Sequence, residues 1–486
     1  MRSFKQAIGR VKNLASESAL RALSAVLPGI LSAIFTAVLL VGCSDFLNSD
    51  KSKSTNGPAV GLSEGTKRPD VNPLPPGFED PNQAPFTEEK MLVNLGINVF
   101  APAASDFAIE ASVLEKRIAR ACQAVASTSD GVSANPVGLP AEWAEAQTQW
   151  KRAMLAFHRA DSFPVGPLWD DDKKLSMRIY SWPLFNSCGI DNETVRLKDG
   201  IASLPSDLPN PVRGLGALEY LLFESSMATK CNSRAYPQVI KWTALTQAEK
   251  RRDRCAQASR LAADLSEQAR ILSQEWDPKG RNYTRRFIDK SDARYPNARA
   301  AANAVTDGLF QIEALKDLRL ARPLGFHKDC VSPTGKCPQD SEHPFSDFAL
   351  ESAGARLAAF GDALRGQFTG AQGPTNGFGF DDLLISHGHA DIATKLGGLV
   401  DTSRQGFKKF ATIVGSGTGT GVGGRTFIAE IDSISKDDCV ASTSSDRRVE
   451  ICALFQDVRA VSTSLKAELL AVLALRSPPT YQGDND

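Results

Sequence analysis

The fold is decided by residues 88–127, which read EEKMLVNLGINVFAPAASDFAIEASVLEKRIARACQAVAS. Apolar residues recur there every three or four positions, which is the period of an amphipathic α-helix. The positions at this spacing are Leu92, Leu95, Val99, Phe107, Ile109, Val113, Leu114 and Ile118. Pro102 lies within the segment and predicts a kink, because proline removes a backbone donor and clashes with the preceding turn.

The helical period continues along most of the remaining chain. It predicts helices at Ala141–Ala160, Pro211–Phe223, Thr246–Trp276, Ala298–Leu318, Phe345–Gln367, Phe380–Ile385, Ala390–Ile413 and Arg447–Leu475. Alternation of β-branched residues is nearly absent, and Thr426–Ile431 is one weak strand candidate. The prediction is an all-α protein of two tandem helical bundles. Each half contains a short helix with paired leucines, Leu221-Leu222 and Leu383-Leu384, which suggests a duplicated four-helix-type bundle.

The N-terminus has the layout of an export signal. Basic residues between Arg2 and Lys12 precede an apolar stretch that ends at Gly42. In Leu40-Val41-Gly42-Cys43 a small residue stands before cysteine, the pattern of a bacterial lipobox, so we expect cleavage before Cys43 and acylation of its thiol, for example by palmitate. Ser44 follows instead of aspartate and favours the outer membrane over the inner one. The alternative is an uncleaved membrane helix, for which the stretch is short.

The segment after Cys43 is rich in Ser, Asn, Gly, Pro and charge and poor in aliphatic residues, which is typical of a disordered tether. About 400 residues follow it, more than one hydrophobic core usually organises. The predicted organisation is a lipoprotein signal peptide at 1–42, the acylated cysteine and tether at 43–86, an N-terminal helical bundle at 87–320 and a C-terminal helical bundle at 321–480.

The charge of the chain gives no sign of a nucleic-acid partner. There are 56 Lys and Arg against 56 Asp and Glu, and residues 1–42 contain five of these bases and one acid. The mature chain therefore has 51 bases and 55 acids, a net charge of −4. No basic block stands out after the signal, and this argues against nucleic-acid binding.

Eight cysteines remain after Cys43, and in an oxidising periplasm an even set predicts disulfides. They are Cys122, Cys188, Cys231, Cys255, Cys330, Cys337, Cys439 and Cys452. Proximity along the chain favours the pairs Cys231–Cys255, Cys330–Cys337 and Cys439–Cys452, which leaves Cys122–Cys188, although the residues leave the connectivity open. No CxxC occurs, so a zinc cluster is disfavoured.

Two motifs that resemble known binding sites have ordinary explanations. The glycine run 415–424 contains Gly419-x-Gly421-x-x-Gly424 and a near P-loop, but the P-loop lysine is missing, so a surface loop is expected. No HExxH occurs among the five histidines. His387-Gly-His389 precedes a predicted helix and is interpreted as exposed. His158 lies near the end of helix 141–160, where a helix C-terminus favours the charged form, and it remains a candidate metal ligand.

One glutamate stands out because it lies in an apolar helix. Glu219 belongs to the stripe Leu218–Phe223, and a carboxylate there needs a partner, a metal or a proton. We expect Arg178 or Arg213 to pair with it, in preference to a catalytic role. The candidate binding cleft comprises Arg178, Trp182, Arg213, Gly214, Gly216 and Glu219, with Arg152 less firmly assigned.

The order of these motifs is similar to that of a known family. Trp150, Phe163, Gly166-Pro167 and Arg178-Ile-Tyr-Ser-Trp182-Pro183 are followed by Arg213-Gly-Leu-Gly-Ala-Leu-Glu-Tyr-Leu-Leu-Phe223. This pattern resembles the imelysin family, also called insulin-cleaving membrane protease-like proteins, and within it the predicted periplasmic lipoproteins. Phe345-Ser346, Leu350-Glu351 and Gly379-Phe-Asp-Asp-Leu-Leu384 resemble its second half. The likeness covers residues 90–480 and implies two tandem four-helix-type bundles with a site where they meet.

The family signature G-x-H-x-x-E reads here Gly214-Leu-Gly216-Ala-Leu-Glu219, so Gly216 replaces the histidine. The resemblance links members to iron uptake and, less securely, to metallopeptidase activity, and this departure puts metal binding and hydrolysis in doubt. We expect a binding lipoprotein of the cell outer membrane, facing the periplasm, with an iron-uptake component as partner and iron or another divalent metal weakly bound at Glu219, with His158 as a further ligand. The alternatives are a metallopeptidase-like hydrolase that uses Glu219 with His158 or His387, and a structural or protein-interaction lipoprotein.

Overall fold

The computed structural model describes residues 84–127, 140–163, 165–290, 292–414 and 426–473. The predicted signal peptide, Cys43 and the glycine run 415–424 lie outside these residues. Within the described ranges the protein is helical, apart from one small hairpin. The predicted all-α helical-bundle class is therefore confirmed.

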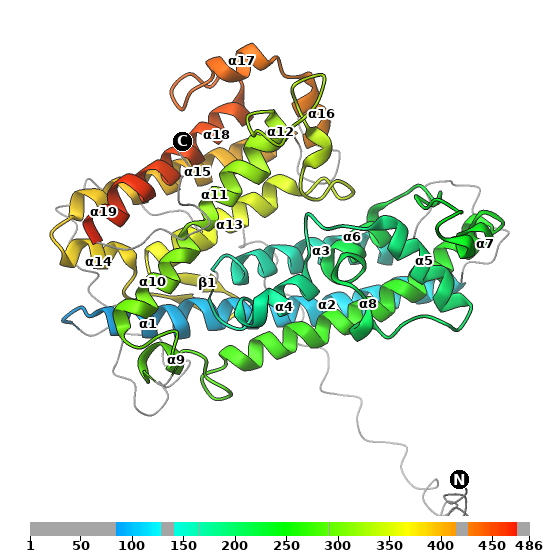
Figure 1. Ribbon diagram of the computed structural model, residues 1–486, viewed down its shortest axis with the longest axis horizontal. Helices are drawn as coiled ribbons and strands as arrows, with labels where there is room; N and C mark the ends of the chain where they lie inside the picture. The colour runs from blue at the N-terminus through cyan, green and yellow to red at the C-terminus, as the bar shows by residue number, and fades with distance from the viewer. Residues whose placement is uncertain (1–83, 128–139, 164, 291, 415–425, 474–486) are drawn as a thin grey trace, which may run out of the picture. The chain divides into compact units, whose positions relative to one another are not determined.

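The first group of helices is packed around residues 88–127, the segment with the clearest helical period. Helices α2 and α3 lie side by side, α2 also packs against α8, and α6 packs against both α3 and α8 (Figure 1). The elements are α1 (Glu88–Asn94), η1 (Leu95–Phe100), α2 (Ala101–Ser127), α3 (Ala141–Ala160), α4 (Asp170–Ile179), α5 (Ser187–Lys198), η2 (Pro205–Asp207), η3 (Asn210–Val212), α6 (Gly214–Phe223), η4 (Pro237–Val239), α7 (Ile240–Thr243), α8 (Gln247–Trp276) and α9 (Arg285–Ile288).

The second group is built around three packed helices. Helix α15 packs against both α13 and α18, and the π-helical segment η5 contacts α13 and α18. The elements are α10 (Ala298–Leu309), α11 (Gln311–Ala314), η5 (Leu315–Ala321), α12 (Arg322–Leu324), η6 (Pro338–Asp340), α13 (Ala349–Leu364), β1 (Phe368–Gly370), β2 (Gly373–Thr375), α14 (Phe380–Ser386), α15 (Ala390–Val414), α16 (Phe427–Ser433), α17 (Lys436–Ala441), α18 (Glu450–Ser464), η7 (Leu465–Leu469) and α19 (Leu470–Leu473).

The two groups share one continuous core, because α13 packs against α3 and buried side chains of both groups touch. The domain boundary between residues 320 and 321 therefore stays a prediction. One run of helix, Glu88–Ala126, is long and apolar enough to cross a membrane, and 72% of its most apolar window is buried inside the protein. This burial is that of a core helix, whose apolar stripe faces other helices.

The helix does not break at Pro102. Instead the turn before it widens into the π-helical segment η1, which ends at Phe100. A proline at this position cannot donate to the carbonyl of Asn98, four residues earlier. The hydroxyl of Thr375 donates to that oxygen at 2.6 Å and so satisfies the acceptor. The disturbance at Pro102 is thus accommodated by a π bulge in the preceding turn, and the kink itself stays a prediction.

The described residues contain four disulfides, and two of the expected pairs are wrong. Cys330–Cys337 and Cys439–Cys452 form as expected. The other two are Cys122–Cys255 and Cys188–Cys231, in place of Cys122–Cys188 and Cys231–Cys255. The reason is tertiary: Cys122 on α2 and Cys255 on α8 belong to helices that pack together, although 133 residues separate them.

The weak strand candidate Thr426–Ile431 is a helix. Thr426 caps α16, because its side chain accepts a hydrogen bond from the backbone N–H of Ala429. Phe427 and Ile431 are then four residues apart, on one face, and both are buried. The strands of the described ranges are β1 and β2, paired antiparallel with Phe368 opposite Thr375. Gly373, the first residue of β2, takes a φ of +96° where the chain leaves the turn.

Candidate functional site

Helix α6 carries the signature residues and begins at a position that only glycine fits. Gly214 has a φ of +68°, and a Cβ there would lie 2.2 Å from the carbonyl oxygen of Ile179. L residues rarely adopt this φ, and a backbone atom cannot yield to such a clash. Gly214 therefore lets the start of α6 approach the end of α4 closely, which places Glu219 inside the protein with 3% of its surface exposed.

Glu219 is held by the loop that precedes α13, and the expected arginine partner is wrong. Its Oε1 accepts from the backbone N–H groups of Phe345 at 3.1 Å and Ser346 at 3.0 Å, and from the Ser346 hydroxyl at 2.9 Å. Its Oε2 lies 3.1 Å from Nδ1 of His343. These four contacts offset the cost of burying the carboxylate, which is the role we expected an arginine to have. The two arginines lie elsewhere: Arg213 pairs with Asp264 at 2.6 Å, and Arg178 is exposed.

Two further side chains, His158 and Glu342, converge with His343 next to Glu219. Nε2 of His158, from α3, lies 3.4 Å from Nε2 of His343 and 4.0 Å from Oε1 of Glu342. One ligand atom from each of these residues falls within 4.8 Å of the others, and this is the one such trio among the described residues. All three are at most 1% exposed. We call His158, Glu342 and His343 the buried trio.

Two arginines neutralise the carboxylate of the buried trio. Nε of Arg319 donates to Oε2 of Glu342 at 2.8 Å, and Nη2 of Arg356 lies 3.6 Å from Oε1. Burial alone would raise the pKa of Glu342, but the positive charges of Arg319 and Arg356 outweigh it and hold that pKa well below the ordinary value. Glu342 is therefore ionised at neutral pH.

His158 is uncharged, contrary to expectation. Burial, followed by the charge of Arg356, holds the pKa of His158 well below its ordinary value. The favourable effect of the α3 C-terminus is too small to offset the removal of a charged imidazole from water. Tyr180 OH lies 3.4 Å from Nδ1 of His343, and burial raises the pKa of Tyr180 well above its ordinary value. Both groups are thus neutral at physiological pH.

A pocket of about 290 Å³ opens onto this cluster. Glu219 and His343 line it together with Gly216 of α6. The rest of its lining consists of aromatic rings, prolines, an alanine and polar side chains. They are Tyr180, Ser181, Trp182, Pro183, Phe185, Pro211, Ala217, Arg322, Gln339, Asp340, Ser341, Pro344 and Phe345. The hydroxyl of Ser341 is buried and has no hydrogen-bond partner among the described residues.

The pocket takes up only part of the predicted cleft. Trp182, Gly216 and Glu219 line it, while Arg152 and Arg178 are exposed and do not. Arg213 is buried but directed to α8. A Cβ at Gly216 would meet Phe185 and Tyr180 at 3.8 Å, which is ordinary van der Waals distance. The position therefore has room for a side chain, and its glycine leaves the pocket open.

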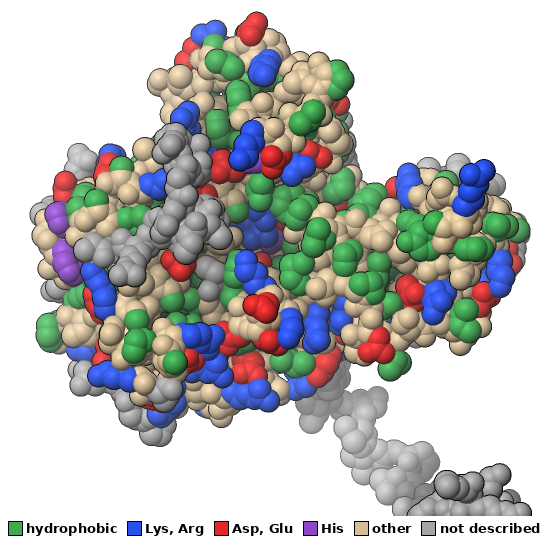
Figure 2. Space-filling view, viewed as in Figure 1, with side chains coloured by type: hydrophobic (Ala, Val, Ile, Leu, Met, Phe, Trp, Pro, Cys, Tyr) green, Lys and Arg blue, Asp and Glu red, His purple; other side chains and the backbone are tan. Residues whose placement is uncertain are grey.

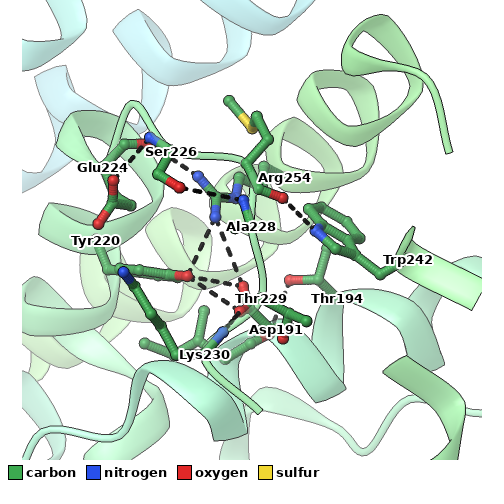
Figure 3. Close-up of polar contacts among 12 residues, drawn as sticks. Asp191, Thr194, Tyr220, Glu224, Ser226, Ala228, Thr229, Lys230, Trp242 and Arg254 are labelled. Atoms are coloured by element: carbon green, nitrogen blue, oxygen red, sulfur yellow. Dashed lines mark hydrogen bonds and ion pairs between the residues drawn. The ribbon is translucent and has the colours of Figure 1, made fainter. Parts of the chain in front are cut away.

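Next to Glu219 on α6, Tyr220 belongs to a buried polar network (Figure 3). The hydroxyl of Tyr220 donates to Asp191 at 3.0 Å and accepts from Nη2 of Arg254 at 3.1 Å. Arg254 also donates to the carbonyl of Glu224, just past the end of α6, at 2.9 Å. Asp191, Tyr220 and Arg254 come from α5, α6 and α8, and Glu224 follows the end of α6, so the network ties the helix that carries Glu219 to its neighbours.

The sequence identified His158 and Glu219 but missed their neighbours. Glu342 and His343 lie just before Phe345-Ser346, which resembles a motif of the family's second half. Their closeness to that motif is the signal in the sequence that points to them. Arg319 and Arg356 have the appearance of ordinary charges on amphipathic helices. His387 is exposed, and its Nδ1 lies 2.9 Å from the carbonyl oxygen of Leu383, outside the buried trio.

Comparison with known proteins agrees with this architecture. The model of the imelysin family (peptidase M75) matches residues 100–464. The chain is similar to the crystal structure of an imelysin-like protein from Psychrobacter arcticum, with 14% identity, a TM-score of 0.51, and coverage of 80% of this chain and 96% of that one. It is equally similar to a "putative iron-regulated protein A precursor" from Parabacteroides distasonis, with 14% identity, a TM-score of 0.51, and coverage of 83% and 97%.

A search of curated proteins gave no match. The two similar crystal structures show that the fold is shared. The family match covers most of the chain and includes α6 and the loop that holds Glu219. The expected resemblance is thus confirmed over both groups of helices. This chain belongs to the imelysin family.

Proposed function

We propose that this protein is a ligand-binding lipoprotein of the bacterial cell envelope that serves iron acquisition. The observation that carries the proposal is the pocket at Glu219 and His343, which is built from the signature helix α6 and the loop before α13. Its volume of about 290 Å³ is at the lower end of sites that take small molecules. One similar structure is described as iron-regulated, and this supports the link to iron.

The lining of the pocket indicates a small ligand with a flat apolar part. Tyr180, Trp182 and Phe345 offer aromatic surface, and aromatic walls with a few polar groups are typical of such sites. Ser341 offers a free hydroxyl to fix the orientation of the ligand. On the face that Figure 2 shows, basic and acidic side chains are interspersed, which fits a small ligand better than a polyanion.

Peptidase activity is the less supported function. A metallopeptidase needs a base or carboxylate that is free to act on water beside the metal. Glu219 is fully engaged, since Phe345 and Ser346 donate to one of its oxygens and His343 occupies the other. The single observation in favour of hydrolysis is the set of two histidines and a glutamate in the buried trio, which zinc peptidases also use.

Filling the pocket tests the binding function. Gly216→Trp would place an indole against Tyr180 and Phe185 inside the pocket, and Gly398→Trp is the matched control because a Cβ at Gly398 meets open space. We expect the control to restore growth of a deletion strain under iron chelation and the pocket variant to fail, with equal amounts of folded protein. Equal growth of both strains would contradict the proposal.

The membrane anchor has a separate test. Cys43→Ser should leave an unprocessed and unacylated protein, because the lipobox thiol is the acceptor of the lipid. Metabolic labelling with palmitate measures this, and an unlabelled native protein in a bacterial host would remove the lipoprotein assignment.

A further inference from the structure

We propose that the buried trio binds one divalent transition-metal ion, with Nε2 of His158, Nε2 of His343 and Oε1 of Glu342 as ligands. The inference deepens the proposed binding function, on which its link to iron rests. It moves the metal away from the signature position: the helix α6 supplies no ligand, and α3 and the loop before α13 supply all three.

The distances suit a first-row metal. Metal–nitrogen bonds of about 2.0–2.1 Å place two ligands of a tetrahedral site about 3.4 Å apart. The Nε2 atoms of His158 and His343 are 3.4 Å apart. Oε1 of Glu342 lies 4.0 Å from Nε2 of His158, so a small rotation of the carboxylate completes the set. Two histidines with one carboxylate are ligands for Fe²⁺ and Zn²⁺ alike.

The surrounding contacts leave the ligand atoms of His343 and Glu342 available. Because the carboxylate of Glu219 accepts from Nδ1 of His343, that imidazole carries its proton on Nδ1 and presents a lone pair at Nε2. Arg319 engages Oε2 of Glu342, while Oε1 accepts no hydrogen bond from any described residue. Glu219 thereby acts as the orienting partner of a metal ligand, a role that carboxylates commonly have beside histidine ligands.

The charges nearby set the strength of binding. Arg319 pairs with Glu342 at 2.8 Å and Arg356 lies 3.6 Å from the same carboxylate, so two guanidiniums stand beside the ligand position. Their positive charges repel a dication. We therefore expect weaker binding than in closed structural zinc sites, of a kind that allows release.

The pocket supplies a route to the trio. His343 lines the pocket and belongs to the trio, and Gly216 lines the same pocket without contributing a side chain. Because the trio is at most 1% exposed, an ion reaches it through the pocket and loses its water there. Gly216, which replaces the histidine of the family signature, then keeps the route to the trio open. This offers a physical reason why the chain differs from the signature at that position.

The experiment uses the purified soluble chain, stripped with EDTA and titrated with Co²⁺ and Zn²⁺. We expect one ion per chain, a cobalt spectrum of low-symmetry nitrogen and oxygen coordination, and two exchangeable, paramagnetically shifted imidazole N–H resonances. His158→Gln should abolish these signals, and Glu219→Gln should weaken binding about 10- to 100-fold. The double variant His387→Gln/His389→Gln removes two histidines outside the trio and should bind as the native protein does.

Two outcomes overturn the inference: no binding by the native protein, or binding that survives His158→Gln and is lost in the double variant. Should His158→Gln fail to fold, the count of imidazole resonances in the native cobalt protein decides alone. Failure of the proposed pocket function can be told apart from failure of the metal site. If the pocket has no role, Gly216→Trp restores growth under iron chelation, and the native protein still binds one metal ion.

Discussion

Glu219→Gln is the substitution that best tests the geometry of the site. It removes a charge while keeping the shape of the side chain, so the amide oxygen can still face Phe345 and Ser346. The amide nitrogen must then face Nδ1 of His343, where the carboxylate oxygen stood at 3.1 Å. As this nitrogen is a donor, His343 has to accept at Nδ1 and move its proton to Nε2.

The magnitude follows from the three hydrogen bonds to Oε1. Bonds to a charged acceptor contribute about 1.5–3 kcal/mol each and neutral ones about 0.5–1.5 kcal/mol, so the three together lose roughly 3 kcal/mol. Burying a neutral amide costs less than burying a carboxylate, which offsets part of this loss. We expect Glu219→Gln to lower the free energy of unfolding by about 2 kcal/mol.

The assay is urea unfolding of the metal-free protein with its disulfides intact. The matched control is Ser346→Ala, which removes one donor at 2.9 Å and leaves the carboxylate with both backbone donors, so a loss of about 1–2 kcal/mol is expected. Nitrogen-15 NMR of the imidazoles reports the tautomer of His343. A Glu219→Gln protein as stable as the native one, with the proton still on Nδ1, would refute the reasoning.

Two further predictions concern stability. Loss of Cys122–Cys255 should lower the free energy of unfolding by about 5 kcal/mol, and loss of Cys330–Cys337 by about 2.4 kcal/mol. The first disulfide closes a loop of 133 residues and the second a loop of 7. Denaturation of variants with both cysteines of a pair changed to serine measures the difference, and equal losses would contradict the prediction. Burial and the neighbouring Asp382 raise the pKa of Asp381 to about 7. Its stabilising contribution is therefore complete below the unfolded pKa near 4 and is lost as pH rises through 7. Asp381→Asn should stabilise the protein by about 2–4 kcal/mol at pH 8 and hardly at pH 4, and a pH-independent effect would show the assignment to be wrong.

The sequence predicted the helices well and the contacts between them poorly. The bounds of α3 coincide with the predicted Ala141–Ala160, and α8 starts directly after its capping residue Thr246, because apolar period and caps are local signals. Glu219 and His343 are 124 residues apart, and no local signal connects them. The disulfide pairs and the partner of Glu219 were mispredicted for this reason: both depend on which helices pack together.

The loop conformation of His343 adds a second reason. Its φ is +59°, which is uncommon for a histidine and depends on the surrounding contacts. This backbone turn brings Nδ1 to Glu219 and Nε2 to His158, so one residue links α6 with α3. A sequence pattern does not reveal such a turn, whereas the adjacent motif Phe345-Ser346 marks the segment in which to look for it.

The two glycines of the signature offer a last, matched prediction. Gly214→Ala should destabilise the protein by at least about 2 kcal/mol, because the φ of +68° is strained for alanine and the Cβ would lie 2.2 Å from a backbone oxygen. Gly216→Ala should be neutral or stabilise the helix by up to about 0.5 kcal/mol, since its nearest neighbours lie at 3.8 Å and alanine favours helix. Thermal unfolding of the two variants measures the contrast. If both lost the same stability, Gly216 would be required by packing, and its role as the open route to His343 would have to be abandoned. A strong loss at Gly214 alone would show that the backbone requires the first glycine of the signature, whereas position 216 tolerates a side chain and is free to vary with the ligand.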